Sequence, residues 1–441
     1  MLATAAPPIL IIGGGLTGAA VGRALCRNMP VDNIVVWEAS EGIGGRFATE
    51  RPTNGGACDT GAQYVTITDD LAVAEENAAL YDELLGKGTL APMAGRIEGT
   101  RAADGGGKNY VAPNGVSSIV SHLFSSCGLR PTCARSAVSL RRGKLAAGGG
   151  WEVRAADGHT QVFSGVVLTQ PVPEMLSLLD SGEGGEWLDA PVADDISERL
   201  KRSDLTSLQY SSRYALSLFF PPSAASTFGA EIDWVARYIS KEEDDALVYI
   251  GHDSAKRSGG GGGGGGGDAE GVVSLIAHTS VPYGIKQLKQ GAAESDVLSD
   301  LTTRVKKLLP WLPEPQHVTL KAWGVSQVRS GPRGHQRLAC EASPTSPCTP
   351  SHLTSPRLPS PHLPSPQVRY PLSLSDGAAC WHLQPAAAEA ARQVAEAAGQ
   401  EAPPLILAGD AFSPLGSRFD GCVQSGEHAA RTMLRALARA S

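Results

Sequence analysis

The sequence predicts a two-domain α/β fold, in which a domain with a parallel sheet is joined to a second domain with a mixed sheet. Three observations lead to this expectation. The chain starts with a strand–helix–strand pattern, its middle holds many short strand-like runs, and a buried strand followed by a long helix stands near its end. With 441 residues, the chain can form two or three domains with sizeable cores.

The expected elements follow from apolar periodicity. Short β-branched runs at 9–12 and 34–37 flank a helical pattern at 17–27, which makes a βαβ unit. Further helices are expected at 71–85, 115–124, 385–398 and 421–438. Further strands are expected at 151–154, 162–168, 214–220, 235–239, 246–250, 272–278 and 405–408.

Composition and charge exclude several classes of protein. Lys plus Arg number 38 and Asp plus Glu 45, so the formal net charge of −7 gives no basic footprint for nucleic acid or an anionic membrane. No apolar run approaches the roughly 18–20 residues that span a bilayer. The eight cysteines form no CxxC pair and no zinc-like Cys/His cluster, so no metal site is predicted. We expect a soluble, cytoplasmic protein without a targeting segment.

Two segments do not read as parts of a packed fold. Nine consecutive glycines at 259–267 predict a flexible surface loop, because they have no side chains to bury. The stretch around 330–366 is dense in Pro, Ser, His and Arg, which is typical of a disordered insertion.

The edges of this second segment suggest its origin. The tripeptide at 327–329, Gln-Val-Arg, recurs at 367–369. Valine codons begin with GT and one glutamine codon ends in AG, so the segment 328–367 can be read as an unspliced intron that keeps the reading frame. A natural disordered insertion is the alternative interpretation.

The strongest local motif is a GxGxxG sequence formed by Gly13, Gly15 and Gly18, which follows the first strand and opens the first helix. Such glycines permit a tight turn, close approach of a pyrophosphate, and close packing of the helix on the strand, and the helix N-terminus favours anions. Leu16 and Thr17 lie within this turn and belong to the same predicted site. Twenty residues after Gly18, Glu38 ends the second strand, where a carboxylate accepts hydrogen bonds from a ribose.

Two further motifs indicate that the dinucleotide is FAD. A second glycine-rich turn ends in Gly45-Arg46 and offers another backbone approach and a cation. Near the C-terminus, a buried strand runs into Gly409-Asp410, which places a carboxylate at the edge of the sheet. The last helix, with Gly421 and Ser425, can direct its positive end at a flavin. The spacing of Glu38 and Gly45-Arg46 resembles that of FAD proteins of the amine-oxidase and glutathione-reductase-like superfamily, so we expect an amine-oxidase-like two-domain flavoprotein that binds FAD non-covalently.

Several longer strings resemble the renalase family more specifically. The similarity runs in order from about residue 9 to about residue 434, interrupted by the two unusual segments. The matching strings are Asp59-Thr60-Gly61-Ala62-Gln63-Tyr64, Val167-Leu168-Thr169-Gln170-Pro171-Val172-Pro173-Glu174, Ser211-Ser212-Arg213-Tyr214-Ala215-Leu216, His278-Thr279-Ser280-Val281-Pro282-Tyr283-Gly284 and Phe419-Asp420-Gly421-Cys422.

This resemblance implies an oxidase of dihydropyridine nucleotides. Renalases oxidise the 2- and 6-dihydro isomers of NAD(P)H to NAD(P)+ and pass the electrons from FAD to O2, giving H2O2. The expected partners are therefore a small-molecule substrate and O2. Hydride transfer needs stacking geometry and charge control more than a general base, and the sequence offers no Ser/His/Asp triad.

The resemblance also assigns residues to the site. Gln63 and Tyr64 are expected to border the isoalloxazine, after a close backbone approach at Gly61 and Ala62. Val138 is expected to meet the adenine through its backbone, and Thr169 follows the strand that ends at the cofactor. The candidate catalytic residues are Arg213, His278, Gln63 and Tyr64.

Two alternative functions remain open from the sequence. A flavin amine oxidase usually has a lysine near the flavin on a substrate-domain strand, but the expected strand near 211–220 offers Arg213 and no lysine. A FAD-binding protein without turnover is the other alternative. The FAD-binding domain is expected to be discontinuous, from 1–65, 110–175 and 400–441, and the substrate domain comprises 66–109 and 176–399.

Overall fold

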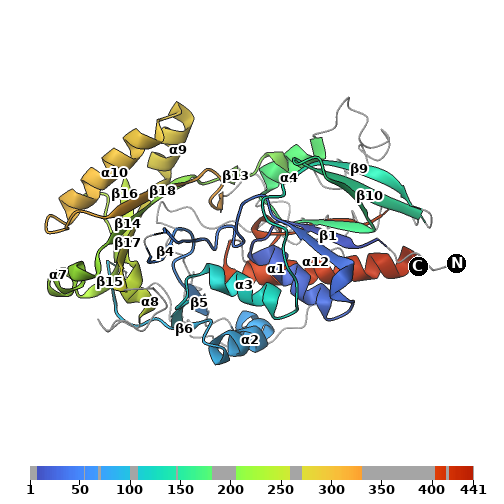
Figure 1. Ribbon diagram of the computed structural model, residues 1–441, viewed down its shortest axis with the longest axis horizontal. Coiled ribbons are helices and arrows are strands. Elements are labelled where there is room, and N and C mark those ends of the chain that lie inside the picture. Colours follow the sequence, from blue (N-terminus) through green and yellow to red (C-terminus); the bar gives the residue numbers. More distant parts are fainter. Residues whose placement is uncertain are drawn as a thin grey trace, which may run out of the picture.

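The structure is a computed structural model that describes most of the chain. The described residues are 7–53, 55–67, 71–99, 108–145, 148–180, 205–258, 271–329, 403–413 and 417–440. The nine-glycine run, all but the first two residues of the segment 328–367 and the helix expected at 385–398 lie outside them. The described part forms two α/β bodies, one on each side of the view in Figure 1.

The first body is built on a four-stranded parallel sheet in the order β2-β1-β12-β20. Its strands are β1 (Ile9–Ile12), β2 (Ile34–Trp37), β12 (Gly165–Leu168) and β20 (Leu405–Leu407). Strand β1 is buried on both faces because alternate side chains enter different cores: Ile9 and Ile11 face one core, and Leu10 and Ile12 the other. The βαβ start predicted from the sequence is confirmed.

Helices cover one face of this sheet and a smaller sheet covers the other (Figure 1). The helices are α1 (Leu16–Cys26), α2 (Leu71–Gly86), α3 (Ser117–Ser125) and α12 (Phe419–Ala440). The opposite face carries the antiparallel strands β9 (Ala137–Leu145), β10 (Gly148–Ala155) and β11 (Thr160–Phe163), with α4 (Val172–Asp180). Helices α1 and α12 pack closely, since a Cβ at Gly426 would lie 2.6 Å from Ala20 Cβ.

The second body is built on a mixed sheet, as the sequence predicts. The sheet has six strands in the order β18-β14-β17-β16-β15-β7. Neighbouring strands in this sheet are antiparallel, except that β15 and β7 are parallel. The strands are β7 (Arg96–Glu98), β14 (Arg213–Phe220), β15 (Trp234–Tyr238), β16 (Leu247–His252), β17 (Val273–Thr279) and β18 (His317–Trp323). The helices of this body are α7 (Ala225–Glu231), α8 (Asp253–Arg257), α9 (Val281–Gln290) and α10 (Glu294–Leu308).

Local signals fix the helices on this second sheet. Ser280 caps α9 by accepting a hydrogen bond from Tyr283 N (3.3 Å), and Gly291 ends it with φ of 61°. In α10, Val297, Leu301 and Val305 are fully buried against the sheet, at the spacing of one helix face.

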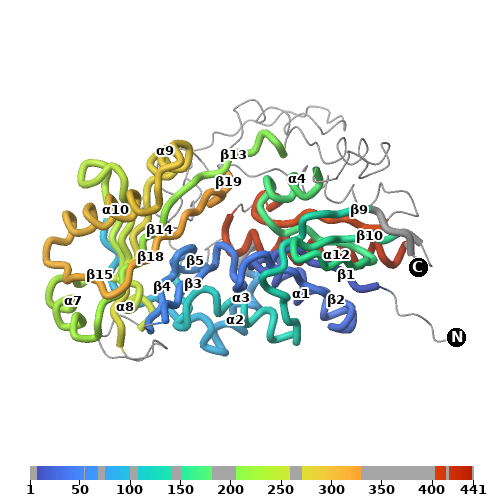
Figure 2. The backbone as a smooth tube through the Cα atoms, turned by 45° about the horizontal axis from the view of Figure 1, so that its top comes forward, coloured from blue at the N-terminus to red at the C-terminus, as the bar shows by residue number. Residues whose placement is uncertain are grey.

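Other short elements complete the described fold. They include β3 (Thr49–Glu50), β4 (Cys58–Asp59), β5 (Val65–Ile67), β6 (Ala91–Pro92), β8 (Lys108–Val111), β13 (Gln209–Tyr210) and β19 (Val328–Arg329). The 3-10 turns are η1 (Val31–Asn33), η2 (Pro222–Ala224) and η5 (Asp410–Phe412). Figure 2 shows β13 and β19 side by side between β14 and α4, on the path from one body to the other.

Two features differ from the sequence-based expectations. The single strand expected at 162–168 is two strands, β11 and β12, because the chain changes sheets at Ser164, whose N–H bonds to Pro8 O (3.0 Å). The sequence-based boundaries place helix α2 in the substrate domain, but Leu80, Tyr81 and Leu84 pack in the core of the first body. Strand β7, in contrast, belongs to the second sheet. The segment 66–109 is therefore divided between the two bodies. In the described residues, no helix has the length and apolar character to span a membrane.

Candidate active site

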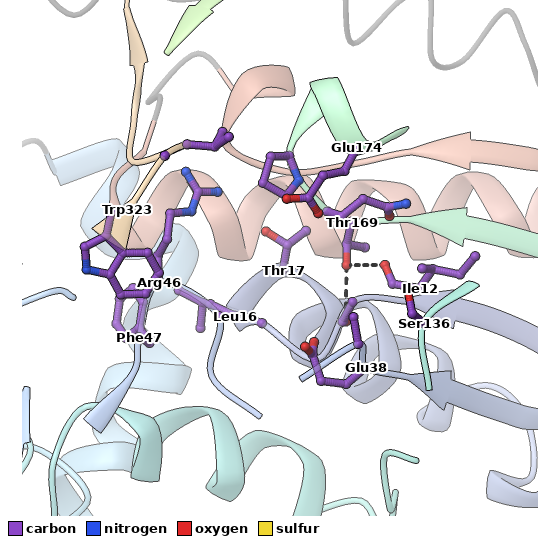
Figure 3. Close-up of a pocket in the computed structure, with 18 of the residues that line it drawn as sticks. Ile12, Leu16, Thr17, Glu38, Arg46, Phe47, Ser136, Thr169, Glu174 and Trp323 are labelled. Atoms are coloured by element: carbon purple, nitrogen blue, oxygen red, sulfur yellow. Dashed lines mark hydrogen bonds between the residues drawn. The ribbon is translucent and has the colours of Figure 1, made fainter. Parts of the chain in front are cut away.

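A cavity of about 970 Å³ lies between the carboxyl ends of the parallel strands and the second sheet. Its wall includes residues from the first glycine turn, the end of β2, strand β9 and the end of β12. The other side is formed by β18 and the loop that follows it. Figure 3 shows Trp323 on one side of the lining and Ser136 on the other, with Thr17 and Arg46 between them. The cavity thus lies at the C-terminal edge of the parallel sheet, where α/β proteins bind ligands.

The first glycine turn forms one wall of the cavity. Gly13, with φ of 114°, packs against Thr169, whose hydroxyl donates to Ile12 O (2.9 Å) or Gly13 O (3.2 Å) (Figure 3). A Cβ at Gly13 would lie 2.5 Å from Thr169 Oγ1. A Cβ at Gly15 would meet nothing nearer than Gly44 O at 3.8 Å, so this position opens toward the cavity, beside the first turn of α1. Gly13, Gly15, Leu16, Thr17 and Thr169 all line the cavity, while Gly18 lies behind the turn.

Glu38 lies at the end of β2, as its spacing from the glycines predicts. Its carboxylate accepts from Gly14 N (2.6 Å) and from Ser40 N (2.8 Å). These bonds fix the carboxylate in the cavity wall next to Trp37. Val138 of β9 lies on the same part of the wall and is 36% exposed.

The second glycine turn lies directly against the first. Gly44 N donates to Gly14 O (2.9 Å), and Gly45 has φ of 56°, a conformation that favours glycine. The following Arg46 enters the cavity wall and makes two bonds to the carboxylate of Asp410, with Nη1–Oδ2 of 2.6 Å and Nη2–Oδ1 of 2.8 Å. Although burial alone would raise it, the charge of Arg46 lowers the pKa of Asp410 below its ordinary value.

The C-terminal motif supports this wall from behind. Gly409 N donates to Ser425 Oγ (3.0 Å), which ties the end of β20 to α12. Ser417 Oγ donates to Asp410 Oδ2 (2.6 Å), so the Asp410 carboxylate faces Arg46 and Ser417. Ser417 and Cys422 line the cavity, but Gly409, Asp410, Gly421 and Ser425 do not. Burial raises the pKa of the Cys422 thiol to about 12, which keeps it protonated.

The four candidate catalytic residues are buried and stand behind the cavity wall. Gln63, Tyr64, Arg213 and His278 are 0%, 4%, 2% and 1% exposed, and none is among the lining residues, whereas Ala62 is. Gln63 Nε2 lies 3.3 Å from His278 Nε2, and Tyr64 bonds to the hydroxyl of Tyr238 (2.8 Å). Arg213 donates from Nη1 to Thr279 O (2.9 Å). The structure therefore brings Gln63 and His278 into contact, with Arg213 bonded to Thr279, the residue after His278. Direct contact of these groups with a substrate stays a prediction.

His278 is held in its neutral form. Burial first, and then the charges of Arg213 and Lys256, lower its pKa to about 3. A neutral imidazole at this position can keep a fixed tautomer but does not act as a charged group at neutral pH.

The sequence analysis missed several residues of the wall. Trp323 and Lys321 end strand β18 and line the cavity, with Lys321 Nζ 5.4 Å from the Trp323 ring centroid. Trp323 Nε1 donates to Thr60 O (2.9 Å), which joins β18 to residues 59–64, the segment that contains the predicted flavin contacts Gln63 and Tyr64. Other lining residues that the sequence did not predict include Arg135, Ser136, Gln170, Glu174, Ser326 and Gln327. Their signal in the sequence is weak because they lie in loops and on helix α4, and only tertiary packing brings these segments to the cavity.

The cavity does have a lysine, and it lies on β18, the strand next to β14. Lys321 pairs with Ala215 of β14, the strand on which the sequence offered Arg213 and no lysine. It is exposed and faces the cavity from the second body. The cavity wall therefore carries a lysine even though β14 has none.

The arrangement fits a flavin dinucleotide. The first turn of α1 and the open position at Gly15 suit a pyrophosphate, Glu38 suits a ribose, and the cavity continues past Arg46 to Ala62 and Trp323. In the described residues, no group of three His, Cys, Asp or Glu side chains could hold a metal ion.

Comparisons with known proteins define the class. Residues 11–84 match the family model described as an NAD(P)-binding Rossmann-like domain. The fold matches the crystal structure of a protein assigned as a protoporphyrinogen oxidase from Exiguobacterium sp. 255-15, with a TM-score of 0.60 over 98% of this chain and 99% of that chain, at 12% identity. The chain is a two-domain α/β flavin-dependent oxidoreductase.

A closer relative identifies the family. Mouse renalase is 31% identical over 327 residues, which cover 73% of this chain and 85% of the mouse protein. The chain belongs to the renalase family.

Proposed function

We propose that the protein is a FAD-dependent oxidase of the 2- and 6-dihydro isomers of NAD(P)H, which regenerates NAD(P)+ and reduces O2 to H2O2. One observation carries the proposal. The cavity runs from the carboxylate of Glu38 past Gly15 and the first turn of α1 to a wall of Ala62, Lys321 and Trp323 from both bodies. A flavin held along it would present one ring face to the second body, where a second planar ring can stack. Membership of the renalase family supports this substrate class.

The chain's own residues would hold each part of FAD. Glu38 would bind the adenosine ribose, Gly15 and the first turn of α1 the pyrophosphate, and Arg46 the phosphate side of the flavin. When bound, FAD would supply the acceptor for a hydride and the route of two electrons to O2. The predicted FAD contacts that do not line the cavity (Gly18, Gly61, Gln63, Tyr64, Gly409, Asp410, Gly421 and Ser425) would act by fixing the wall.

The protein's contribution to the reaction would be orientation and charge. Trp323 offers an aromatic surface, and its bond to Thr60 O fixes the indole beside Ala62. Lys321 places a cation at the same wall, where it would attract the phosphates of a dinucleotide substrate. Hydride transfer requires no proton from these groups, so a wall without a positioned general base suffices.

Amine oxidation is the second candidate function, and Lys321 is the observation that favours it. A cavity-lining lysine on a substrate-domain strand is the feature expected of that class. A substrate amine would, however, meet a cation there, which would oppose its protonated form. We therefore rank it below dihydronicotinamide oxidation. The expected cytoplasmic location remains a prediction.

Anaerobic mixing tests the proposal. Purified protein is mixed separately with 6-dihydroNAD, β-NADH and benzylamine, and the flavin absorbance band is followed. Bleaching by the dihydro isomer alone, followed by H2O2 on admission of air, supports the proposal. Bleaching by benzylamine assigns the protein to the amine oxidases, and bound flavin that no substrate bleaches assigns it to FAD-binding proteins without turnover.

A further inference from the structure

A buried ionic cluster joins the two bodies directly behind the cavity wall. Asp59 comes from β4, just before the predicted flavin contacts at 61–64. Asp253, Lys256 and Arg257 come from α8 of the second body. These four side chains are 1%, 0%, 0% and 3% exposed. The two carboxylates balance the two cations, so the cluster as a whole is neutral when all four groups are charged.

Lys256 is the centre of this cluster. Its Nζ lies 2.6 Å from Asp253 Oδ1 and 3.6 Å from Asp59 Oδ2, and it donates to Gln63 Oε1 (3.2 Å). Arg257 is directed elsewhere, toward Asp253 Oδ2 (3.0 Å) and Ala57 O (2.7 Å). Lys256 therefore connects α8 of the second body to the Gln63 side chain. Buried ion pairs contribute little net stability, so a buried lysine at such a place calls for another role.

The Gln63 amide connects Lys256 to the backbone of the wall. Because its Oε1 accepts from Lys256, its Nε2 is directed to Asp59 O and to Gly61 O (3.1 Å), and it lies 3.3 Å from His278 Nε2. The amide has little freedom to rotate, since a reversed orientation would place its NH2 group against the ammonium of Lys256.

The part of the wall formed by Gly61 and Ala62 is tightly packed. Ala62 N donates to Arg46 O (3.0 Å), and a Cβ at Gly61 would lie 1.9 Å from the same oxygen. On the other side, Trp323 holds Thr60 O. Ala62 is the member of this segment that lines the cavity. A displacement of the Gln63 side chain would therefore be passed to Gly61 and Ala62, and so to any ring bound against them.

We propose that Lys256 is a positioning residue for the flavin, which acts through the Gln63 amide to fix the Gly61–Ala62 wall of the cavity. The inference rests on the proposed FAD site and deepens it, because it assigns part of that site's geometry to a helix of the other body. Lys256 does not touch the cofactor or the substrate in this arrangement. Its contribution is the orientation of an amide and, through it, of a peptide segment.

The test uses the full-length protein with Lys256→Met, Lys256→Arg, Gln63→Met and the double variant Lys256→Met/Gln63→Met. Lys306→Met is the matched control, since Lys306 is half-exposed and pairs with Glu314 (2.6 Å) far from the cavity. We measure the Kd of FAD, the absorbance maxima of bound flavin, the kcat and KM for 6-dihydroNAD, and Tm.

Both single methionine variants should weaken FAD binding by about tenfold or more and shift the flavin spectrum, as loss of a supporting contact does at other sites. The double variant should be no weaker than the worse single one, because both break the same connection. Lys256→Arg should restore part of the FAD affinity, and the control should match the parent protein.

Gln63→Met keeps the hypothesis open to refutation if Lys256→Met does not fold, because it leaves the pair of Lys256 with Asp253 intact. A lowered Tm with unchanged FAD affinity and spectrum in Gln63→Met would show a purely structural role and overturn the inference, as would strictly additive effects in the double variant. If the parent protein binds no FAD at all, the proposed function fails and the inference fails with it.

Discussion

Arg46 and Asp410, which are 364 residues apart in the sequence, form a bidentate ion pair. This pair joins the N-terminal glycine turns to the end of the C-terminal strand β20. The Asp410 side chain is 3% exposed and that of Arg46 is 27% exposed, so the pair is closed on the carboxylate side and open to the cavity on the arginine side. Arg46 Nη1 also donates to Ser326 O (3.1 Å), in the loop after β18. One guanidinium therefore ties together three distant segments of the cavity wall.

Asp410→Asn should lower both the stability of the protein and its affinity for FAD. The substitution leaves Arg46 without a balancing charge, and breaking a buried pair costs about 3–5 kcal/mol. Because Arg46 is partly exposed, we expect the lower end, about 3 kcal/mol of unfolding free energy, measured by urea denaturation. Glu152→Gln, which breaks the exposed pair with Arg141 (2.8 Å), should cost less than about 1 kcal/mol. Equal losses in the two variants would contradict this prediction.

Gly15→Val and Gly18→Ala should separate binding from folding. Gly15 has an extended backbone conformation and open space beyond its Cα, so valine fits the fold but projects into the phosphate cradle. A Cβ at Gly18 would lie 2.0 Å from Gly13 O, where neither backbone can yield easily. We therefore expect a folded Gly15→Val protein that lacks flavin, and a Gly18→Ala protein of reduced Tm.

Circular dichroism and the flavin absorbance of the purified variants measure both effects. Flavin retained at the parental level in Gly15→Val would show that the phosphates lie elsewhere. An unchanged Tm in Gly18→Ala would show that the turn relaxes.

The parts of the site that sequence reasoning reached are those encoded locally. Gly13, Gly15 and Glu38 are recognisable because a strand, a turn and a helix follow each other within a short stretch. The parallel sheet and the closing helix could be predicted for the same reason, from apolar runs of the right length.

The parts that it missed depend on strand pairing and on packing between the bodies. Lys321 and Trp323 reach the cavity because β18 pairs with β14 in one particular register, which the apolar pattern of β18 does not fix. The spacing of Asp253 with Lys256 and Arg257 is that of an ordinary exposed helix face, and only the packing of α8 against β4 and β17 buries it. The placement of Gln63, Tyr64, Arg213 and His278 behind the wall could not be read from their motifs either.

His278 should make the protein less stable as the pH falls below neutrality. The imidazole has a pKa of about 3 in the folded protein and of about 6.5 in the unfolded chain, so the unfolded chain binds the proton first. The stabilising contribution is complete well above pH 6.5 and is lost as the pH falls toward 3. The loss amounts to about 2 kcal/mol at pH 5. Urea unfolding at pH 7 and pH 5 measures it against His278→Gln, which lacks the titrating group.

The comparison with His278→Gln isolates this group from its neighbours. Burial and the charge of Asp253 raise the pKa of Asp59 to about 6, which acts with the opposite sign, because stability is then lost as the pH rises through 6. Asp59 is present in both proteins and its effect largely cancels in the difference. If the parent and His278→Gln lose the same stability between pH 7 and pH 5, folding does not lower the pKa of His278.

Deletion of residues 328–367 should leave the described fold and the cavity unchanged. Val328 pairs with Tyr210, and Arg329 with Gln209, in the short β13–β19 ladder beside the cavity. The deletion joins Gln327 to Val368-Arg369, which supplies the same two residues at the same positions. The Ser211 N–H bond to Gln327 O (2.8 Å) is also retained, so the strand that closes this side of the wall can form as before.

Flavin content and Tm of the deleted and full-length proteins measure this outcome, and sequencing of transcripts across the region tests the intron interpretation separately. A deleted protein with flavin and a Tm at least equal to that of the full-length chain agrees with the prediction, because the ladder has identical residues in both. Deletion of residues 327–367, one residue more, is the matched control: it removes Gln327 from the cavity wall and brings Ser326 directly before Val368. If the 40-residue deletion loses flavin as the 41-residue deletion does, residues 328–367 contribute to the site and the intron interpretation loses its structural support.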